Sequence, residues 1–301
     1  MPRMTATPLE QAPEPISRGR PLWLKREDRH ELGAFKWRGA MPTLERFRAD
    51  GVEAVVTAST GNHGAATAWA AARRGMRAVV FAPEAASGAK VDKLAALGAE
   101  LHLVGEDLDA SKDLAREFAS EHGLAFLEDG AEPAQFDGYA AIGREIVQQL
   151  GERPARVVVP VGNGALLIGV ARGLGGDGAV GVVAKEAPVM YLSVAAGRPV
   201  DCDQAATFAD GMAVRVAVPI AVEELVRLGM PFVEVSERAL AQAVGAFAAA
   251  GIRVEGSGAA ALAALDVLEP ADGPVVLVVT GSNIDDELHR RAVERPESFP
   301  D

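Results

Sequence analysis

The sequence is poor in cysteine and has neither a membrane-length apolar run nor a secretion signal. Cys202 is the only cysteine among the 301 residues, which excludes an intrachain disulfide and a multi-cysteine metal site and fits a reducing compartment. Glycine or arginine interrupts each apolar stretch before it reaches the length that a transmembrane helix needs. Residues 1–5 (MPRMT) also lack the apolar segment and cleavage site of a signal peptide. We therefore expect a soluble, cytoplasmic protein without a membrane partner.

Basic residues are also scarce. The 30 Lys and Arg residues are outnumbered by 42 Asp and Glu, which gives a net charge of −12. Because nucleic-acid binding depends on clustered Lys and Arg, this balance excludes nucleic acid as the main partner. In contrast, 49% of the residues are hydrophobic and 32 are glycine, so the chain can bury a large core and pack helices closely on sheets. Its length fits one large domain, or two domains that share an active site.

Apolar strands and helical segments alternate along the chain. The predicted strands are residues 21–26, 54–58, 78–82, 100–104, 156–161, 180–184 and 275–279. The predicted helices are residues 38–50, 65–74, 89–97, 109–122, 139–150, 236–250 and 258–268, with one more that runs through residue 173. Such alternation predicts a parallel sheet with right-handed crossovers. The glycine-rich residues 173–178 predict a surface turn rather than a nucleotide loop, because no helical pattern follows them directly.

One lysine has an unusual setting. Lys36 lies between Phe35 and Trp37, and the predicted strand just downstream ends in the turn at residues 59–64 (STGNHG). A lysine amine in a rigid aromatic setting can form an imine, and the backbone amides of such a turn can bind a carboxylate. This pairing points to pyridoxal phosphate chemistry. The alternatives are an ordinary surface lysine and a plain strand–helix turn.

A second turn, residues 162–165 (GNGA), joins an apolar strand to an apolar helix. Amides at a helix N-terminus can point at a dianion, and the helix dipole adds attraction, so we predict that a cofactor phosphate binds here. Because backbone amides would do the binding, Asn163 needs only to tolerate the backbone geometry, which Asn does better than most residues. A tight strand–helix connection without a ligand is the alternative.

Four blocks, in their order along the chain, resemble the threonine/serine dehydratase and serine racemase group of fold-type II pyridoxal phosphate enzymes. The blocks are residues 33–40 (GAFKWRGA), 57–64 (TASTGNHG), 159–166 (VPVGNGAL) and 279–285 (VTGSNID), with weaker matches at 24–28 (LKRED), 209–214 (ADGMAV) and 255–260 (EGSGAA). The resemblance implies an α/β fold of two domains, like that of the tryptophan synthase β subunit, each with a mostly parallel sheet flanked by helices. It implies a large cofactor-binding domain (residues 1–53 and 133–301), a small substrate-facing domain (residues 54–132), and an active site between them at the carboxyl ends of the strands.

The resemblance also implies which residues hold the cofactor. Lys36 is the Schiff-base lysine and the base that moves the α-proton, and Phe35 lies beside it, while Ala34 replaces the serine that the family usually has. Thr280 aligns with the Ser, Thr or Cys that faces the pyridine nitrogen, where a neutral hydroxyl favours elimination from Cβ over chemistry that needs a long-lived carbanion. Glu255 is a further candidate near the ring, with helix capping as its alternative role. The phosphate is implied at Gly162, Asn163, Gly164, Ala165 and Leu166, where relatives usually show four glycines.

The substrate residues follow from the same resemblance. Asn62 is implied to contact the 3′-oxygen of the cofactor. Racemases fill position 60 with a serine that reprotonates the opposite face, so Thr60 joins Lys36 as a catalytic candidate, although threonine makes efficient racemisation unexpected. His63 lies at the start of a predicted helix, which favours structural hydrogen bonding. The substrate carboxylate is implied at Ser59, Thr60, Gly61, Asn62 and His63.

We expect no metal site. The family's cation-binding Glu aligns with Val183, Glu186 reads as a solvated loop residue, and the remaining histidines have no metal-ligand spacing. Asp285 and Asp286 are expected to be a charge pair at a helix N-terminus rather than ring contacts.

The function expected from these residues is that of a pyridoxal-phosphate-dependent ammonia-lyase. It would convert a β-hydroxy amino acid such as L-threonine or L-serine to a 2-oxo acid and ammonia by α,β-elimination, and we expect a homodimer. Three alternatives stay open: a threonine-synthase-like or other β/γ-replacement enzyme, an amino-acid racemase, and a catalytically silent cofactor-binding homologue. Trp37 and His63 depart from the threonine synthase pattern, and Lys36 argues against a silent protein. Because the chain ends soon after the Thr280 block, we expect no C-terminal regulatory domain.

Overall fold

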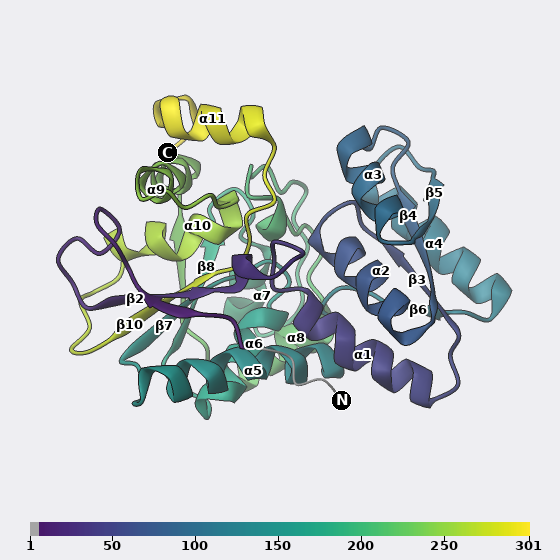
Figure 1. Cartoon of the computed structure of the whole chain (residues 1–301), viewed down its shortest axis with the longest axis horizontal. Helices are drawn as coiled ribbons and strands as arrows, with labels where there is room; N and C mark the ends of the chain where they lie inside the picture. The colour runs from purple at the N-terminus through teal and green to yellow at the C-terminus, as the bar shows by residue number, and fades with distance from the viewer. Residues whose placement is uncertain (1–5) are drawn as a thin grey trace. The chain divides into compact units, whose positions relative to one another are not determined.

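The computed structural model describes residues 6–301, which form two compact units (Figure 1). Residues 1–5, on which the expected absence of a signal peptide depends, lie outside the described residues. The larger unit contains the described residues up to Phe35 together with Tyr139–Asp301, and the smaller unit contains Lys36–Gly138. Each unit has a mostly parallel sheet flanked by helices, which confirms the predicted fold class.

A six-stranded sheet is the base of the larger unit, with the order β1-β2-β10-β7-β8-β9. The strands are β1 (Leu9–Gln11), β2 (Leu22–Arg26), β7 (Arg156–Pro160), β8 (Ala179–Ala184), β9 (Phe232–Val235) and β10 (Val275–Val279). Only the edge strand β1 is antiparallel to its neighbour among the described strands. The central strands β7, β8 and β10 are nearly continuous runs of buried aliphatic residues, as expected for parallel strands that are covered on both faces.

Helices cover this sheet (Figure 1). Helix α6 (Ala165–Leu174) packs on β7 and β8, and α10 (Gly256–Ala263) packs on β7, β8 and β10. The other helices are α5 (Pro133–Leu150), which crosses the boundary between the units, α7 (Val189–Ala196), α8 (Pro219–Leu228), α9 (Glu237–Ala249) and α11 (Asp286–Glu294). Short 3-10 turns in the described part of the chain are η1 (Glu27–Arg29), η2 (Asp210–Met212), η3 (Ala264–Asp266) and η4 (Pro296–Ser298).

The smaller unit has a four-stranded parallel sheet with the order β5-β4-β3-β6. Its strands are β3 (Ala54–Ala58), β4 (Arg77–Ala82), β5 (Glu100–Leu103) and β6 (Ala125–Phe126), and its helices are α1 (Trp37–Ala49), α2 (Asn62–Arg74), α3 (Gly88–Ala96) and α4 (Leu108–His122). Consecutive side chains of β4 serve opposite faces. Val79 packs with Ala115 and Ala119 of α4, whereas Val80 packs with Ala65 of α2 and Leu94 of α3.

The predicted strands and helices are all present, most of them within a few residues at their ends. The helix predicted at 139–150 begins earlier, at Pro133, and the one predicted at 258–268 ends at Ala263, where η3 follows. The segment 173–178 is a turn, as predicted, and Gly175 ends α6 in a left-handed conformation with φ 91°. The sequence patterns did not reveal β1, β6, β9, α7 and α8. Contacts place the unit boundaries at 35/36 and 138/139, so α1 groups with the smaller unit, whereas we expected boundaries at 53/54 and 132/133. The reason is packing between α1 and α2, where the rings of Trp37 and Trp69 meet edge to face with centroids 6.3 Å apart.

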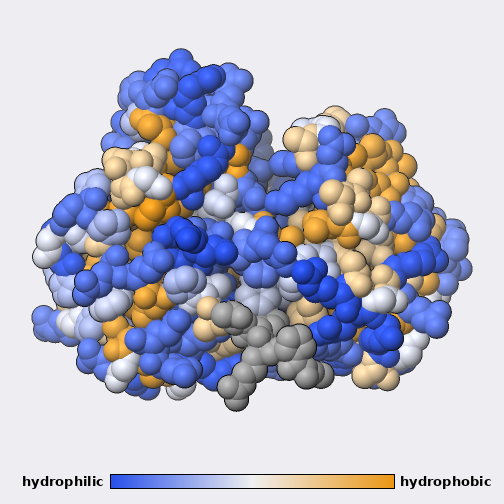
Figure 2. All heavy atoms as spheres, in the orientation of Figure 1, coloured by the Kyte–Doolittle hydropathy of each residue, from blue (hydrophilic) through white to orange (hydrophobic). Residues whose placement is uncertain are grey.

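The surface drawn in Figure 2 is largely hydrophilic, with apolar residues in scattered groups. None of the helices within residues 6–301 combines the length and the apolar character needed to cross a bilayer.

Candidate active site

Several of the predicted site residues lie in the loops at the carboxyl ends of parallel strands or in the first turn of the helix that follows. In the larger unit β7 and β10 are parallel neighbours, so residues 161–164 and Thr280 leave the same edge of the sheet. In the smaller unit β3 and β6 are parallel neighbours, so residues 59–61 and 127–129 leave the same edge. Ligands of open α/β sheets bind at this edge. Thr280 and the turns after β3 and β7 therefore lie at the edge of each sheet at which a ligand is expected.

Lys36 directly precedes α1 and contacts a carboxylate that the sequence did not single out. Its Nζ lies 2.5 Å from Oδ2 of Asp129, and the Lys36 side chain is only 13% exposed. Asp129 follows the two-residue strand β6, 93 positions further along the chain. A surface lysine would be solvated, so the structure favours a positioned amine. Asp129 is the functional candidate that sequence reasoning missed.

His63 lies between Asp129 and Thr57 of β3. The His63 ring is buried, with Nε2 3.0 Å from the Thr57 hydroxyl and Nδ1 3.5 Å from Oδ1 of Asp129. Thr57 in turn donates to the carbonyl of Leu127 at 2.8 Å. Burial lowers the pKa of His63 from its ordinary value of 6.5, and the nearby Asp129 carboxylate partly opposes this effect. These contacts agree with the structural hydrogen bonding expected for His63.

The turn at residues 59–64 leads from β3 into the N-terminus of α2. Ser59 Oγ accepts from the Gly61 amide at 3.1 Å, and α2 begins at Asn62 without a side-chain cap. A helix supplies no carbonyl for the amides of its own first turn, so these amides suit a carboxylate. Gly64 allows the close approach, because a Cβ atom there would collide with the Ser59 carbonyl oxygen. Thr60, the second catalytic candidate, is half-buried in the same turn.

The predicted phosphate loop joins β7 to α6, and its tight geometry depends on two glycines. A Cβ atom at Gly162 would collide with the Gly211 carbonyl oxygen. Gly164 has φ +91°, and a Cβ atom there would lie 2.7 Å from Leu225.

Asn163 does not take the unusual backbone conformation that we expected it to tolerate. The left-handed residue is Gly164, and Asn163 instead accepts from the Ala165 amide through its side-chain oxygen at 3.1 Å. The expectation that Asn163 serves by tolerating unusual backbone geometry was therefore wrong, because the glycine takes that conformation. The contact shows that the Ala165 amide faces an oxygen acceptor at the N-terminus of α6. Leu166 follows Ala165 in the first turn of that helix and is buried.

Thr280 directly follows β10 and is 2% exposed. Among the described residues its hydroxyl has no hydrogen-bond partner, although buried hydroxyls nearly always have one. The Thr280 carbonyl accepts from the Phe35 amide at 3.1 Å, and Ala34 pairs with Gly281 in an isolated bridge. Phe35, the residue before Lys36, is therefore anchored to the end of β10. Its ring also packs against Tyr139, with centroids 5.1 Å apart.

Glu255 is buried at the start of α10, but it does not cap that helix through its side chain. One carboxylate oxygen accepts from the Ser257 hydroxyl at 2.7 Å, and the other accepts from the Asn283 amide at 3.2 Å. A Cβ atom at Gly281 would lie 2.8 Å from this carboxylate. The capping alternative is thus not observed, and Glu255 lies beside the backbone of the Thr280 block. Asp285 does cap α11, accepting from the amides of Glu287 and Leu288, as its predicted place at a helix N-terminus implied.

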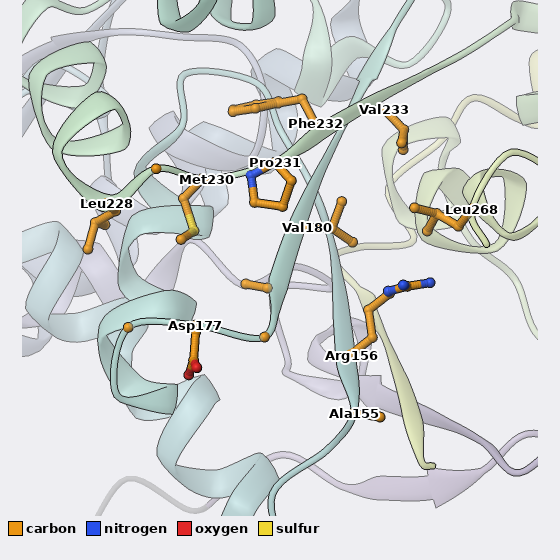
Figure 3. A pocket seen from close by; sticks show the side chains of 14 residues that line it. Ala155, Arg156, Asp177, Val180, Leu228, Met230, Pro231, Phe232, Val233 and Leu268 are labelled. Atoms are coloured by element: carbon orange, nitrogen blue, oxygen red, sulfur yellow. The ribbon is translucent and has the colours of Figure 1, made fainter. Parts of the chain in front are cut away.

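Residues 6–301 contain no cluster of three or more His, Cys, Asp or Glu side chains arranged to hold a metal ion. Val183 is buried inside β8, and Glu186 is exposed in the turn that follows this strand. The hollow in Figure 3 lies at the amino ends of β7, β8 and β9, away from the carboxyl edge. It is lined mainly by apolar side chains such as Phe232, Met230 and Leu268 and contains none of the predicted site residues.

Comparisons with known proteins agree with this geometry. The model of the family described as pyridoxal-phosphate dependent enzyme matches residues 2–281. The chain is similar to an L-threonine ammonia-lyase from Geobacter sulfurreducens, with 33% identity over 291 residues, 92% of this chain and 71% of that protein. It is also similar to a biosynthetic L-threonine dehydratase from Pasteurella multocida, with 34% identity over 215 residues, 69% of this chain and 42% of that protein. The chain thus spans about two fifths of the length of the second relative.

A solved structure of a threonine deaminase has a similar fold. The processed form of threonine deaminase isoform 2 from Solanum lycopersicum superposes with a TM-score of 0.90 and 29% sequence identity. The match covers 96% of this chain and 88% of that chain.

Proposed function

We propose that this chain, which belongs to the family of pyridoxal-phosphate dependent enzymes, is an ammonia-lyase that converts a β-hydroxy amino acid such as L-threonine or L-serine to a 2-oxo acid and ammonia. The names of the threonine ammonia-lyase, dehydratase and deaminase relatives support this assignment. The observation that carries it is the Thr280 hydroxyl, which is buried without a partner among the described residues.

The residues present fit pyridoxal phosphate. The first turn of α6 would hold the dianionic phosphate with backbone amides, and Gly162 and Gly164 keep that turn free of side chains. The Thr280 hydroxyl would face the pyridine nitrogen, and Glu255 would lie near the ring. Lys36 would hold the cofactor covalently, with Phe35 and Asn62 beside it. In this proposal the larger unit supplies the phosphate turn and Thr280, and the smaller unit supplies Lys36 and the turn that binds the substrate.

The chain's own residues then perform three tasks. The turn amides and hydroxyls of residues 59–63 would hold the substrate carboxylate and so orient the Cα–H bond. The Lys36 amine would take the α-proton and hold it as an ammonium group. As the Cβ–O bond breaks, the Lys36 ammonium group would give a proton to the departing β-hydroxyl, which leaves as water. The released enamine product would then hydrolyse to a 2-oxo acid and ammonia.

The bound cofactor would supply an electron sink that makes the α-proton removable. Thr280 sets how strong this sink is. A neutral hydroxyl does not keep the ring nitrogen protonated as a carboxylate would, so the electron sink is weaker. Loss of the β-hydroxyl is then favoured over reprotonation at Cα, because reprotonation needs a longer-lived carbanion. Elimination is therefore favoured over racemisation.

We also propose a homodimer in the cytoplasm. The single cysteine supports a reducing compartment, because Cys202 has no partner for a disulfide within the chain. Light scattering of the purified protein would measure the mass of the assembly.

The test of the proposed activity is a panel of amino acids offered to the protein loaded with pyridoxal phosphate. The panel contains L-threonine, L-serine and their D-enantiomers, and both 2-oxo acid and ammonia are measured. We expect equal amounts of the two products from at least one L-amino acid. Chiral chromatography detects racemisation, and an added thiol detects β-replacement. Cofactor binding without 2-oxo acid from any member would contradict the lyase assignment.

A further inference from the structure

A chain of contacts behind Lys36 runs through Asp129, a residue that the family resemblance does not single out. It starts at the Lys36 amine, passes through the Asp129 carboxylate to the His63 ring, and ends at Thr57 in β3. All four residues belong to the smaller unit, so their geometry is internal to one compact body. Lys36 is at the start of α1, Asp129 follows β6, and His63 is in the first turn of α2. Three separate elements therefore converge on one carboxylate.

The hydrogen bonds fix how the His63 ring is protonated. Thr57 has a single hydroxyl proton, and it donates this proton to the Leu127 carbonyl. His63 Nε2, 3.0 Å from the same hydroxyl oxygen, must then be the donor in their contact. In a neutral ring this tautomer leaves the Nδ1 lone pair facing Oδ1 of Asp129, 3.5 Å away. The protonation of His63 and the charge of Asp129 are thus coupled. A proton on Nδ1 or on Oδ1 would remove the repulsion between these two acceptor atoms.

We propose that Asp129 is a positioning residue for Lys36, with the His63 ring packed against its other carboxylate oxygen. This proposal rests on the proposed function for the role of Lys36 as the acceptor of the α-proton. When Lys36 takes that proton it becomes an ammonium group, and the carboxylate 2.5 Å from Nζ stabilises the new charge. The buried His63 ring lies 3.5 Å from the other carboxylate oxygen and limits how the carboxylate can turn. Asp129 would thereby favour the charge state that proton removal creates.

The neighbouring acid offers a matched control. Glu128 is next to Asp129 in the chain and is also partly buried, but it pairs with Lys112 and with Arg116 at 2.9 Å. Glu128→Gln removes the same charge from the same loop without touching Lys36. Asp129→Asn removes the charge that faces Lys36 and keeps the shape of the side chain. Asp129→Glu keeps the charge on a longer side chain.

Turnover is the first measurement. In the cofactor-loaded protein we expect Asp129→Asn to lower kcat by about tenfold or more while KM changes less than about threefold. With α-deuterated substrate the isotope effect should increase, because proton removal then limits the rate more strongly. Asp129→Glu should recover part of the loss, and Glu128→Gln should keep the wild-type kcat. If Asp129 had a purely structural role, Asp129→Asn would leave the isotope effect unchanged, and Asp129→Glu would not recover more activity than Asp129→Asn.

The second measurement needs neither cofactor nor activity. Nitrogen-detected NMR of the cofactor-free protein reports the tautomer and the titration of His63. The charged groups that act on this ring are Asp129, Lys36 and Lys112. Because the Asp129 carboxylate raises the pKa of His63 against the effect of burial, Asp129→Asn should lower that pKa further. Glu128→Gln should move it much less.

Two outcomes overturn the proposal. One is a kcat of Asp129→Asn within about twofold of wild type, and the other is a pKa of His63 that does not change with this substitution. If the wild-type protein forms no 2-oxo acid, the proposed function fails by itself, and the NMR result still decides whether Asp129 and His63 are coupled.

Discussion

Under the proposed function, Thr280 is the residue whose chemistry separates elimination from the alternative reactions. Its buried hydroxyl is neutral at every accessible pH, so it cannot hold a pyridine nitrogen protonated as a carboxylate would. We predict that Thr280→Asp lowers 2-oxo acid formation by about tenfold or more and raises the share of racemised or transaminated product. The matched control is Thr280→Ser, which keeps the hydroxyl. Unchanged elimination by a folded, cofactor-loaded Thr280→Asp protein would place Thr280 away from the ring.

Sequence reasoning identified Lys36, Thr280 and the residue 59–64 turn because each is marked by local sequence. It missed Asp129 because nothing local marks this residue, a single acid behind a two-residue strand. Its meaning comes from a contact with Lys36 across 93 positions of the chain. The role of Glu255 was open for the same reason, since its partner Asn283 is 28 positions away.

At the scale of elements, the crossing of α5 and α6 depends on glycine. A Cβ atom at Gly143 would collide with the Val170 carbonyl oxygen and lie 2.9 Å from the backbone of Gly173. We predict that Gly143→Ala lowers the free energy of unfolding by about 1–3 kcal/mol, because the helices must separate to make room. Urea denaturation measures the change.

Helix α9 contains the control for this substitution. A Cβ atom at Gly245 would meet nothing closer than Val293 at 4.0 Å. Gly245→Ala should therefore stabilise the protein by up to about 1 kcal/mol through helix propensity. Equal effects of the two substitutions would show that the α5–α6 contact does not depend on glycine.

The central strands were predictable because parallel strands buried on both faces are runs of Val, Ile and Leu. Helices α7 and α8 and strand β9 were missed because their apolar residues lack a clear period or form very short runs. The affiliation of α1 with the smaller unit could not be predicted either. It depends on the packing of Trp37 against Trp69, and tertiary contacts of this kind leave no local pattern.

At the scale of the whole molecule, buried titratable groups predict how stability depends on pH. Burial lowers the pKa of His63 below 6.5, and burial together with Arg253 does the same for His289. The stability that these neutral rings contribute is fully present above pH 6.5 and is lost as the pH falls through their lowered values. Burial raises the pKa of Glu237 above 4.5, so its protonation favours the folded state as the pH falls. Glu237 therefore stabilises the folded state as the pH falls, whereas the two histidines destabilise it.

We predict that the free energy of unfolding falls as the pH is lowered below about 6.5, and that His63→Gln makes this fall shallower. Glu237→Gln should make it steeper, because this substitution removes the one opposing contribution among these three groups. Urea denaturation at a series of pH values gives the slopes. A steeper fall for His63→Gln would contradict the buried, neutral state of that ring.

Composition alone argued against nucleic acid as the main partner, because the chain has 42 acidic and only 30 basic residues. It could not reveal how the chain divides into units, because the boundaries follow from packing.

The central claim is that Lys36 carries the cofactor, and one measurement tests it directly. The protein loaded with pyridoxal phosphate is reduced with borohydride, digested, and mapped by mass spectrometry for the added pyridoxyl group. We predict a single labelled peptide that contains Lys36, and no stable label in Lys36→Ala. Lys25 should stay unlabelled because it is fully buried against Glu145 and Gln149. Stoichiometric label on Lys25, Lys90, Lys93, Lys112 or Lys185 instead of Lys36 would contradict the account.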